Sequence, residues 1–253
     1  MMKISNKLIF AAVILLVLAL FAYDNLLKTE YLTGKYKDIY RDYKTLNFKD
    51  FDAADLPSST ASNVKFIQGP FSVKIAPYAL NYTHITQTGN RLQIQSNFER
   101  SYVYDQFAYV LIISCPKLIE VNTSAVYGIY RGTQTYTDTT VKDDWHMRQV
   151  LIEGFNEDSI SVRQDYGSTV VLSNNHIRAL KAVIGTSDSS GSKIIIRRNN
   201  QIKQANAAIL NKASFMLDGK AIQNLTYQLA DSAKLIFTGS AQNIINNSKS
   251  IKK

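Results

Sequence analysis

The sequence contains a single cysteine, Cys115, so no disulfide can form within the chain. Proline is scarce, with 4 residues, and charged residues make up only 19%. Hydrophobic residues make up 45%, enough for a sizeable core, and the 15 tyrosines accompany many Thr, Ser, Asn and Gln residues. This composition favours strands with polar outer faces over a helical bundle. Cys115 lies in the apolar run YVLIISCPKL without a local histidine base, so we expect a buried, inert thiol.

Motifs for nucleotide chemistry and for nucleophilic hydrolysis are also missing. No phosphate-binding loop, Gly-x-Ser-x-Gly elbow or dinucleotide fingerprint occurs, so we expect no cofactor. The net charge is +9, but the cations are scattered and accompany no DNA- or RNA-reading motif. We therefore expect no nucleic-acid partner. The charge predicts a basic surface that faces an acidic envelope or glycan.

Metal-binding patterns are equally poor. Asp143, Asp144 and His146 cluster in KDDWHMRQ but lack a matched ligand set elsewhere, so no metal site is predicted. His84 and His176 are isolated.

The strongest local feature is the uncharged run from Leu8 to Tyr23, bounded by Lys7 and Asp24. As a helix, its 16 residues reach about 24 Å, somewhat less than the hydrocarbon core of a bilayer. Lysines before the run place its start in the cytoplasm and the bulk of the chain outside. We expect residues 1–23 to be a retained signal anchor, which makes a single-pass membrane protein. A cleaved signal peptide and a buried core helix are the alternatives.

Residues 24–62 are predicted to form a juxtamembrane stem and linker. Tyr36, Tyr40 and Tyr43 share helical spacing, which allows a short interfacial helix. The mixed charges around them favour an extended connector instead. LPSSTASN, at 56–63, is predicted to be a loop.

Alternating apolar residues begin at residue 63 and predict an antiparallel segment at the start of an all-β domain. A Gly69-Pro70 break separates two strand-like runs, and a Thr-Gly-Asn corner at 88–90 predicts a hairpin. The residues expected to point inward are Val64, Phe66, Phe71, Val73, Ile75, Leu92 and Ile94. A strand, a break at Pro116 and a second short strand are expected next.

A recurring corner dominates residues 170–245. Four apolar triplets each run into Asn-Asn or a Gly-containing turn, and the last residues of the triplets are 24, 21 and 20 positions apart. These last residues are Leu172, Ile196, Leu217 and Phe237. A second set of apolar residues follows the corners at similar spacing, and a third lies seven residues further on. The second set is Ile177, Ile202, Ile222 and Ile244, and the third is Ile184, Ile209, Leu229 and Ile251.

This period predicts a parallel β-helix, a solenoid, over residues 63–245, followed by a polar tail at 246–253. Successive coils stack, so the four triplet ends are expected to form one column. Ile194 and Ile196 are expected inside with Ile195 outside, and Asn175 is expected to stack on Asn200. An antiparallel sandwich is the alternative.

At VKFIQGPFSVKI, followed by NRLQIQ, the chain resembles the head-GIN-domain family of candidate auto-transporter adhesins from Bacteroidetes-type bacteria. That family begins with a strand, a Gly-Pro-Phe-like break, a second strand and a short Leu-x-Ile strand. The matching residues are Gly69, Pro70, Phe71, Val73, Ile75, Leu92 and Ile94. The resemblance implies a single-stranded right-handed β-helix, an adhesin-like role and no catalytic residues. The chain departs from the family in its few Gly-Ser-Gly-Asp corners.

These features predict a non-enzymatic, extracytoplasmic module of the bacterial envelope that binds glycan or protein through an exposed sheet face. The rival hypothesis is a carbohydrate-active β-helix enzyme, a lyase or hydrolase, which needs two carboxylates at one cleft. Its candidate residues are Asp143, Asp144, Glu153, Asp158 and Asp165, with Arg163, and with Trp145 and His146 beside them. Tyrosines at 102, 104, 109, 127, 130 and 136 supply either contact area or core. The ligand, the ligand-binding residues and the oligomeric state are left open.

Overall fold

The computed structural model describes residues 4–34, 37–97, 109–128, 135–141 and 148–250. The chain divides into two compact units, Met1–Asp42 and Tyr43–Lys253. The first unit is built on one helix, and the second is almost entirely β-sheet.

Helix α1 runs from Ile4 to Thr33 without a break and has no buried residue. At 1.5 Å per residue its 30 residues reach about 45 Å. By length and composition it can cross a membrane, although a signal sequence near the N-terminus has the same properties. The helix continues past Tyr23 into the predicted stem, because Leu26, Leu27 and their neighbours are good helix formers. It ends at Gly34, whose φ of 67° is the left-handed conformation of a helix C-cap.

The tyrosine helix, the less favoured alternative for the stem, does not form within the described residues. Tyr40 lies in a turn, and Tyr43 leads directly into a strand. Tyr36 lies outside the described residues.

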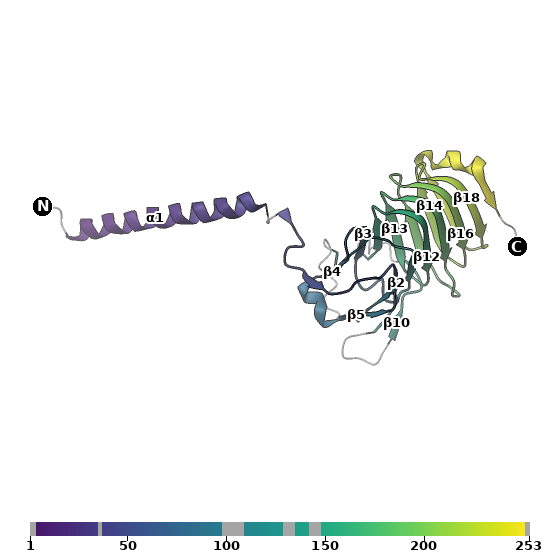
Figure 1. Ribbon diagram of the computed structural model, residues 1–253, viewed down its shortest axis with the longest axis horizontal. Coiled ribbons are helices and arrows are strands. Elements are labelled where there is room, and N and C mark those ends of the chain that lie inside the picture. Colours follow the sequence, from purple (N-terminus) through teal and green to yellow (C-terminus); the bar gives the residue numbers. More distant parts are fainter. Residues whose placement is uncertain (1–3, 35–36, 98–108, 129–134, 142–147, 251–253) are drawn as a thin grey trace. The chain divides into compact units, whose positions relative to one another are not determined.

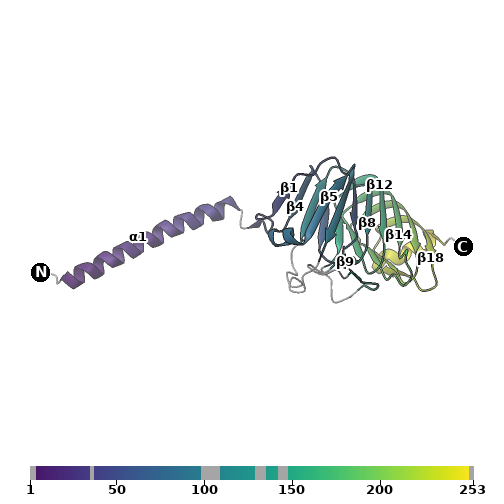
Figure 2. The same ribbon diagram turned by 90° about the horizontal axis from the view of Figure 1, so that it is seen from below.

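Two nine-stranded sheets, named here sheet A and sheet B, make up the second unit (Figures 1 and 2). In spatial order, sheet A contains β1 (Lys44–Leu46), β4 (Ser72–Ile75), β7 (Leu111–Cys115), β3 (Val64–Gln68), β11 (Val150–Glu153), β13 (Thr169–Ser173), β15 (Lys193–Ile196), β17 (Ser214–Asp218) and β19 (Lys234–Thr238). Sheet B contains β20 (Ser248–Ser250), β18 (Ile222–Leu229), β16 (Gln201–Ile209), β14 (His176–Ile184), β12 (Asn156–Gln164), β8 (Glu120–Thr123), β2 (Ala53–Leu56), β6 (Arg91–Ser96) and β5 (Thr83–Thr88). A separate hairpin is formed by β9 (Val126–Gly128) and β10 (Thr135–Thr137).

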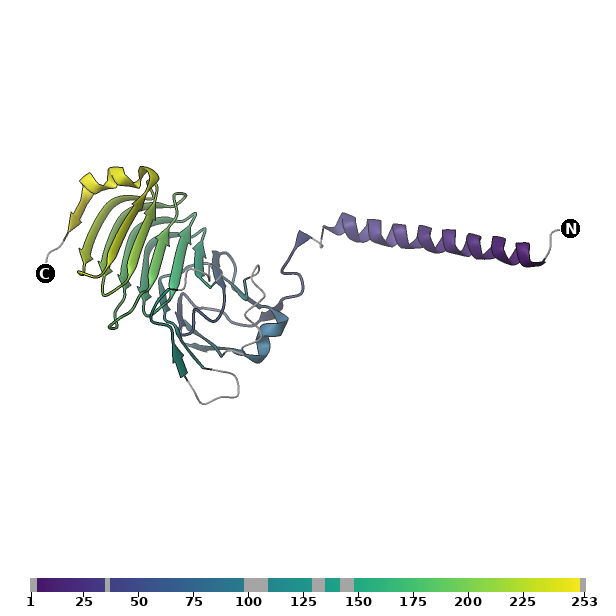
Figure 3. The same cartoon turned by 180° about the vertical axis from the view of Figure 1, so that it is seen from behind.

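From β11 onward the chain alternates between the two sheets, and each strand pairs in parallel with its counterpart one round later. We call one strand of sheet A with the following strand of sheet B a coil; Figure 3 shows the coils stacked side by side. Leu172 pairs with Ile196, and Ile196 pairs with Leu217. Leu217 in turn pairs with Phe237. The predicted apolar column is therefore confirmed, and its first three members have no exposed surface.

Alternation within a coil also follows the prediction. Ile194 and Ile196 are fully buried, while Ile195 between them is partly exposed on the outer face of sheet A. The side chains of the two inner faces form one continuous hydrophobic core. Burying each aliphatic side chain of this kind contributes about 1.5–3 kcal/mol relative to exposing it.

Each sheet is open, with an edge strand at both ends. Each is also mixed, because some strands from the first part of the unit pair antiparallel. β4 pairs antiparallel with β1 and β7, and β5 pairs antiparallel with β6. The hairpin at Gly89 forms as predicted, and all the predicted inward residues are buried except Phe71, which is partly buried. The two strand-like runs around the Gly69-Pro70 break, β3 and β4, were expected to form a pair, and this prediction was wrong. β7 lies between them and pairs with both. Gly69 allows this because a Cβ there would lie 2.7 Å from the Ser114 hydroxyl on β7.

The β unit starts earlier than the sequence suggested. Residues 43–62, expected in the stem and linker, contribute β1 and β2, and Phe51 between them is fully packed at 2% exposure. At the other end, Ser248–Ser250 of the predicted polar tail forms β20, which pairs in parallel with β18. Before it, the 3₁₀ helix η5 (Gly239–Asn247) buries Ala241 and Ile244 against the last coil.

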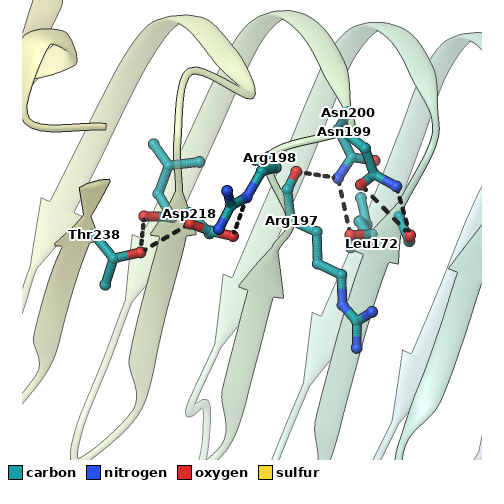
Figure 4. A network of polar contacts seen from close by, with 9 residues as sticks. Leu172, Arg197, Arg198, Asn199, Asn200, Asp218 and Thr238 are labelled. Carbon is teal, nitrogen blue, oxygen red and sulfur yellow. Dashed lines mark hydrogen bonds and ion pairs between the residues drawn. The ribbon is translucent and has the colours of Figure 1, made fainter. Parts of the chain in front are cut away.

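Buried asparagines connect successive coils at the recurring corner, as predicted. The Oδ1 atom of Asn200 accepts hydrogen bonds from the backbone N and from Nδ2 of Asn175, at 3.0 and 2.9 Å. Nδ2 of Asn200 donates to the carbonyl groups of Leu172 and Arg197, at 2.8 and 2.7 Å (Figure 4). In the next coil no asparagine takes the corresponding place; instead Arg198 forms an ion pair with Asp218 at the end of β17. Arg197 points away from this network (Figure 4).

Cys115 behaves as predicted. Its side chain is fully buried, and burial is the main cause that raises the pKa of its thiol to about 12. An un-ionised thiol inside the core is not a nucleophile at neutral pH.

Candidate functional site

The outer face of sheet B carries two grooves. One has a volume of about 590 Å³ and lies over β5, β6, β2, β8 and β12; we call it the Arg163 groove. The other has a volume of about 680 Å³ and lies over the first residues of β12, β14, β16 and β18; we call it the Arg178 groove. Both lie within the usual size range of small-ligand sites.

A single cross-strand row forms the floor of the Arg163 groove. Gln93 is paired with Asp55, and Asp55 is paired with Asn122. Asn122 is paired with Arg163 on the next strand. Because neighbouring strands lie about 4.8 Å apart, the row is roughly 14 Å long. All four side chains point outward, since the residues that alternate with them fill the core.

Arg91 holds the acidic side chains of this groove in place. Its guanidinium donates to Asp55 Oδ1 and to Glu120 Oε2, both at 2.6 Å. Nδ2 of Asn122 donates to the same Asp55 oxygen at 2.8 Å. The hydrogen bond from Arg91 is the largest cause that lowers the pKa of Glu120, so this carboxylate stays ionised at neutral pH. Asn122 Oδ1 is buried and has no hydrogen-bond partner among the described residues.

Asp165, at the end of the groove, serves the fold. Its carboxylate accepts hydrogen bonds from the backbone N of Tyr166 and of Ser187, each at 2.9 Å, and from the Ser187 hydroxyl at 2.5 Å. Burial acts to raise the pKa of Asp165, but these hydrogen bonds outweigh it and lower the pKa. The carboxylate links two successive corners and holds Tyr166 at a φ of 51°.

The Arg178 groove exists because the long strands of sheet B extend beyond the short strand β8. Arg178 Nε contacts Asp158 Oδ1 at 3.1 Å, with both side chains largely exposed. His176 and Lys203 line the same groove. Glu157 accepts a hydrogen bond from the backbone N of Leu118 at 3.3 Å, and burial raises its pKa.

The structure separates the carboxylates that the enzyme hypothesis requires. Glu153 lies on sheet A, paired with Lys65 Nζ at 2.5 Å. Asp158 and Asp165 lie at opposite ends of β12, seven residues apart, which corresponds to about 23 Å of extended strand. Paired glycosidase carboxylates lie about 5–10 Å apart. Asp158 and Asp165 therefore do not form a glycosidase pair with each other.

Other predicted residues are dispersed or lie outside the described residues. His84 lines the Arg163 groove and His176 the Arg178 groove, so the two imidazoles are not neighbours. Within the described ranges, no group of three or more His, Cys, Asp or Glu residues could hold a metal ion. Tyr127 and Tyr136 stack on each other across the β9–β10 hairpin, with ring centroids 6.0 Å apart. Asp143, Asp144, Trp145, His146 and Tyr102, Tyr104 and Tyr130 lie outside the described residues.

Sequence reasoning missed the central residues of the Arg163 groove. It identified Arg163, Asp165 and His84 separately, but not Asp55, Asn122 or the clamp Arg91. The available signal was alternation: in AADL, RLQIQ and EVNT the polar residues occupy the outward positions. Their convergence depends on strands that come from distant parts of the chain, which alternation does not reveal.

No protein-family model matches the chain, and no curated protein matches its sequence. Solved structures similar to it include a candidate adhesin from Bacteroides fragilis, with a TM-score of 0.45 and 12% identity, covering 83% of this chain and 93% of the other. A candidate lipid-binding protein from Parabacteroides distasonis gives 0.35 and 12%, over 83% and 96%. A candidate adhesin from Parabacteroides merdae gives 0.34 and 13%, over the same shares. Likeness at this level does not establish a shared function.

Proposed function

We propose that the chain is a non-enzymatic, membrane-tethered module of a bacterial envelope, adhesin-like or structural, with its β unit outside the cytoplasm. In this proposal α1 is a retained signal anchor, and Lys7 before the apolar run keeps its start in the cytoplasm. The β unit binds glycan or protein through the outer face of sheet B.

One observation carries this proposal: sheet B presents a broad polar outer face with two grooves, while its inner face belongs to the core. A wall of side chains projecting from paired strands is rigid, which favours recognition of an extended ligand over chemistry that needs moving parts. The separation of Asp158 from Asp165 and the ion pair of Glu153 with Lys65 favour binding over hydrolysis.

The same proposal includes a finer assignment of the fold. We infer that the coils from β11 to β19 belong to a single-stranded right-handed parallel β-helix of the head-GIN type, with residues 63–245 as its domain. The support is the in-register parallel pairing of every strand from β11 to β18 with its counterpart one coil later.

Protease accessibility tests the location. A C-terminally tagged full-length chain is expressed in a bacterium with two membranes, and protease is added to intact cells and to cells with a permeabilised outer membrane. Digestion of the β unit in intact cells indicates surface exposure, and digestion only after permeabilisation indicates the periplasm. A β unit that resists protease in both, yet is digested after lysis, contradicts the proposal. The size of the mature chain reports whether α1 is retained.

A further inference from the structure

We propose that the Arg163 groove is a binding site for an uncharged sugar, recognised through its hydroxyl groups. This inference rests on the proposed function and names the ligand class for one part of sheet B. Three features of the groove carry it: its rigid acceptors, an available guanidinium and its charge balance.

The acceptors of the groove are positioned before any ligand arrives. Arg91 and Asn122 both donate to Oδ1 of Asp55, which fixes the plane of its carboxylate and leaves Oδ2 with no hydrogen bond among those found in the described residues. Arg91 also donates to Glu120, so one guanidinium holds a carboxylate on β2 and another on β8. A prepositioned polar group loses little conformational entropy on binding, and this favours affinity for a small polar ligand.

Asn122, beside this carboxylate, acts as a positioning residue. Its side-chain amide donates to Asp55 Oδ1, and its own Oδ1 is buried without a partner among the described residues, so a ligand does not reach that oxygen. A buried acceptor without a hydrogen bond costs about 1–3 kcal/mol. Asn122 is held in this position at that cost, and the position is the one that fixes Asp55.

Donors lie one strand further along the row. Arg163 is paired with Asn122 across β8 and β12, is exposed, and shares no ion pair among those found in the described residues. Its planar guanidinium offers five N–H donors. Asp55 Oδ2 as acceptor and Arg163 as donor lie on the same face of sheet B with one strand between them. They suit hydroxyl groups of one ligand, because each hydroxyl both donates and accepts.

Charge separates an uncharged sugar from an acidic one. The groove and its clamp contain Asp55, Glu120 and Asp165 against Arg91 and Arg163, so negative charge is in excess by one. A carboxylate or sulfate on the ligand would be repelled by acids that are already held in place. The Arg178 groove has the opposite balance, with Lys117, Arg178 and Lys203 against Glu157 and Asp158.

Isothermal titration of the full-length chain in phospholipid nanodiscs tests the inference; nanodiscs avoid sugar-based detergents. The probes are gluco-, manno- and galacto-oligosaccharides, with oligogalacturonate as the acidic counterpart. We expect at least one neutral series to bind and oligogalacturonate to bind more weakly. Arg163→Ala is expected to weaken the neutral sugar by about ten-fold or more, the loss of one hydrogen bond to a charged group. Asn122→Ala is also expected to weaken it, because Asp55 loses one of the two donors that hold its carboxylate.

Arg197→Ala is the matched control, because it removes an exposed arginine that lines neither groove and is expected to leave the affinity unchanged. Arg163 is exposed, so its replacement reports on binding even if Asn122→Ala lowers the melting temperature. The inference is overturned if no neutral series binds, if oligogalacturonate binds best, or if Arg163→Ala weakens the neutral sugar no more than Arg197→Ala. Such results leave the proposed function intact, because protease accessibility tests that separately.

Discussion

Asn175 and Asn200 lie one above the other in successive coils, and Oδ1 of Asn200 accepts hydrogen bonds from both the backbone N and the side-chain amide of Asn175. Both residues are almost completely buried, at 0% and 2% exposure. At this buried corner, backbone N–H and C=O groups that water cannot reach therefore form hydrogen bonds with a side chain from the neighbouring coil. The pair couples the two coils through polar contacts, in addition to the apolar column.

Replacing Asn200 by Ala is expected to lower the free energy of unfolding by about 3 kcal/mol, because two donors of Asn175 and the carbonyl of Leu172 lose their partner. Urea denaturation of the full-length chain, followed by circular dichroism, measures this loss. Asn224→Ala is the control: it removes one exposed hydrogen bond to Lys203 and is expected to cost under about 0.5 kcal/mol. Equal losses in the two variants would contradict the role given to the buried ladder.

Two neighbouring isoleucines of β15 provide a matched test of the column. Ile196→Ala removes a fully buried side chain between Leu172 and Leu217, and is expected to cost about 2–5 kcal/mol. Ile195→Ala on the outer face is expected to cost about 1 kcal/mol or less. The same denaturation measures both, and a larger loss at Ile195 would contradict the inward assignment of Ile196.

The thiol of Cys115 is expected to react with a disulfide reagent at pH 8 about a thousand-fold more slowly in the folded chain than in urea. The reason is that burial raises its pKa from the ordinary value to about 12. Because the raised pKa belongs to the folded state, this thiol contributes stability below about pH 8.5 that is lost as the pH rises towards 12. Cys115→Ala is expected to remove that part of the pH dependence. Fast labelling of the folded chain would show that the thiol is accessible.

The clamp at Arg91 is expected to act mainly above pH 4. Arg91→Met is expected to lower the free energy of unfolding by about 1 kcal/mol at pH 7, since its bridges are partly exposed, at 28–35% of the side chains. The pKa of Glu120 is lowered in the fold, so its contribution is present above the ordinary pKa and is lost as pH falls through the lowered one. The difference from wild type is therefore expected to shrink as the pH falls below the ordinary pKa of a glutamate. Arg178→Met, which breaks an exposed pair, is the control and is expected to change little at either pH.

The repeated coils could be predicted from sequence because their information is local. Each triplet, its corner and the residue after it recur at nearly constant spacing, so Leu172 and Ile196 identify the same inward position in two coils. The first part of the β unit has no such repeat. There β3 and β4 both pair with β7, and the register depends on the approach of Gly69 to Ser114.

The candidate site was less predictable for a related reason. Arg163 is a natural candidate, but its partners Asp55 and Asn122 come from strands more than 40 residues earlier in the chain, and they become neighbours only through pairing of β2, β8 and β12. Alternation showed which residues face outward and could not show which of them meet.

The stacking of β15, β17 and β19 in constant register has a consequence for how such a protein can change in size. Because each winding touches only the one before and the one after, the number of windings is set by the gene and not by closure of the architecture. Tandem duplication of residues 193–213 would insert one more winding between β15 and β17 and leave the two ends of the stack as they are. The length of the outer face of sheet B is thus a quantity that evolution, or an engineer, can adjust in single steps.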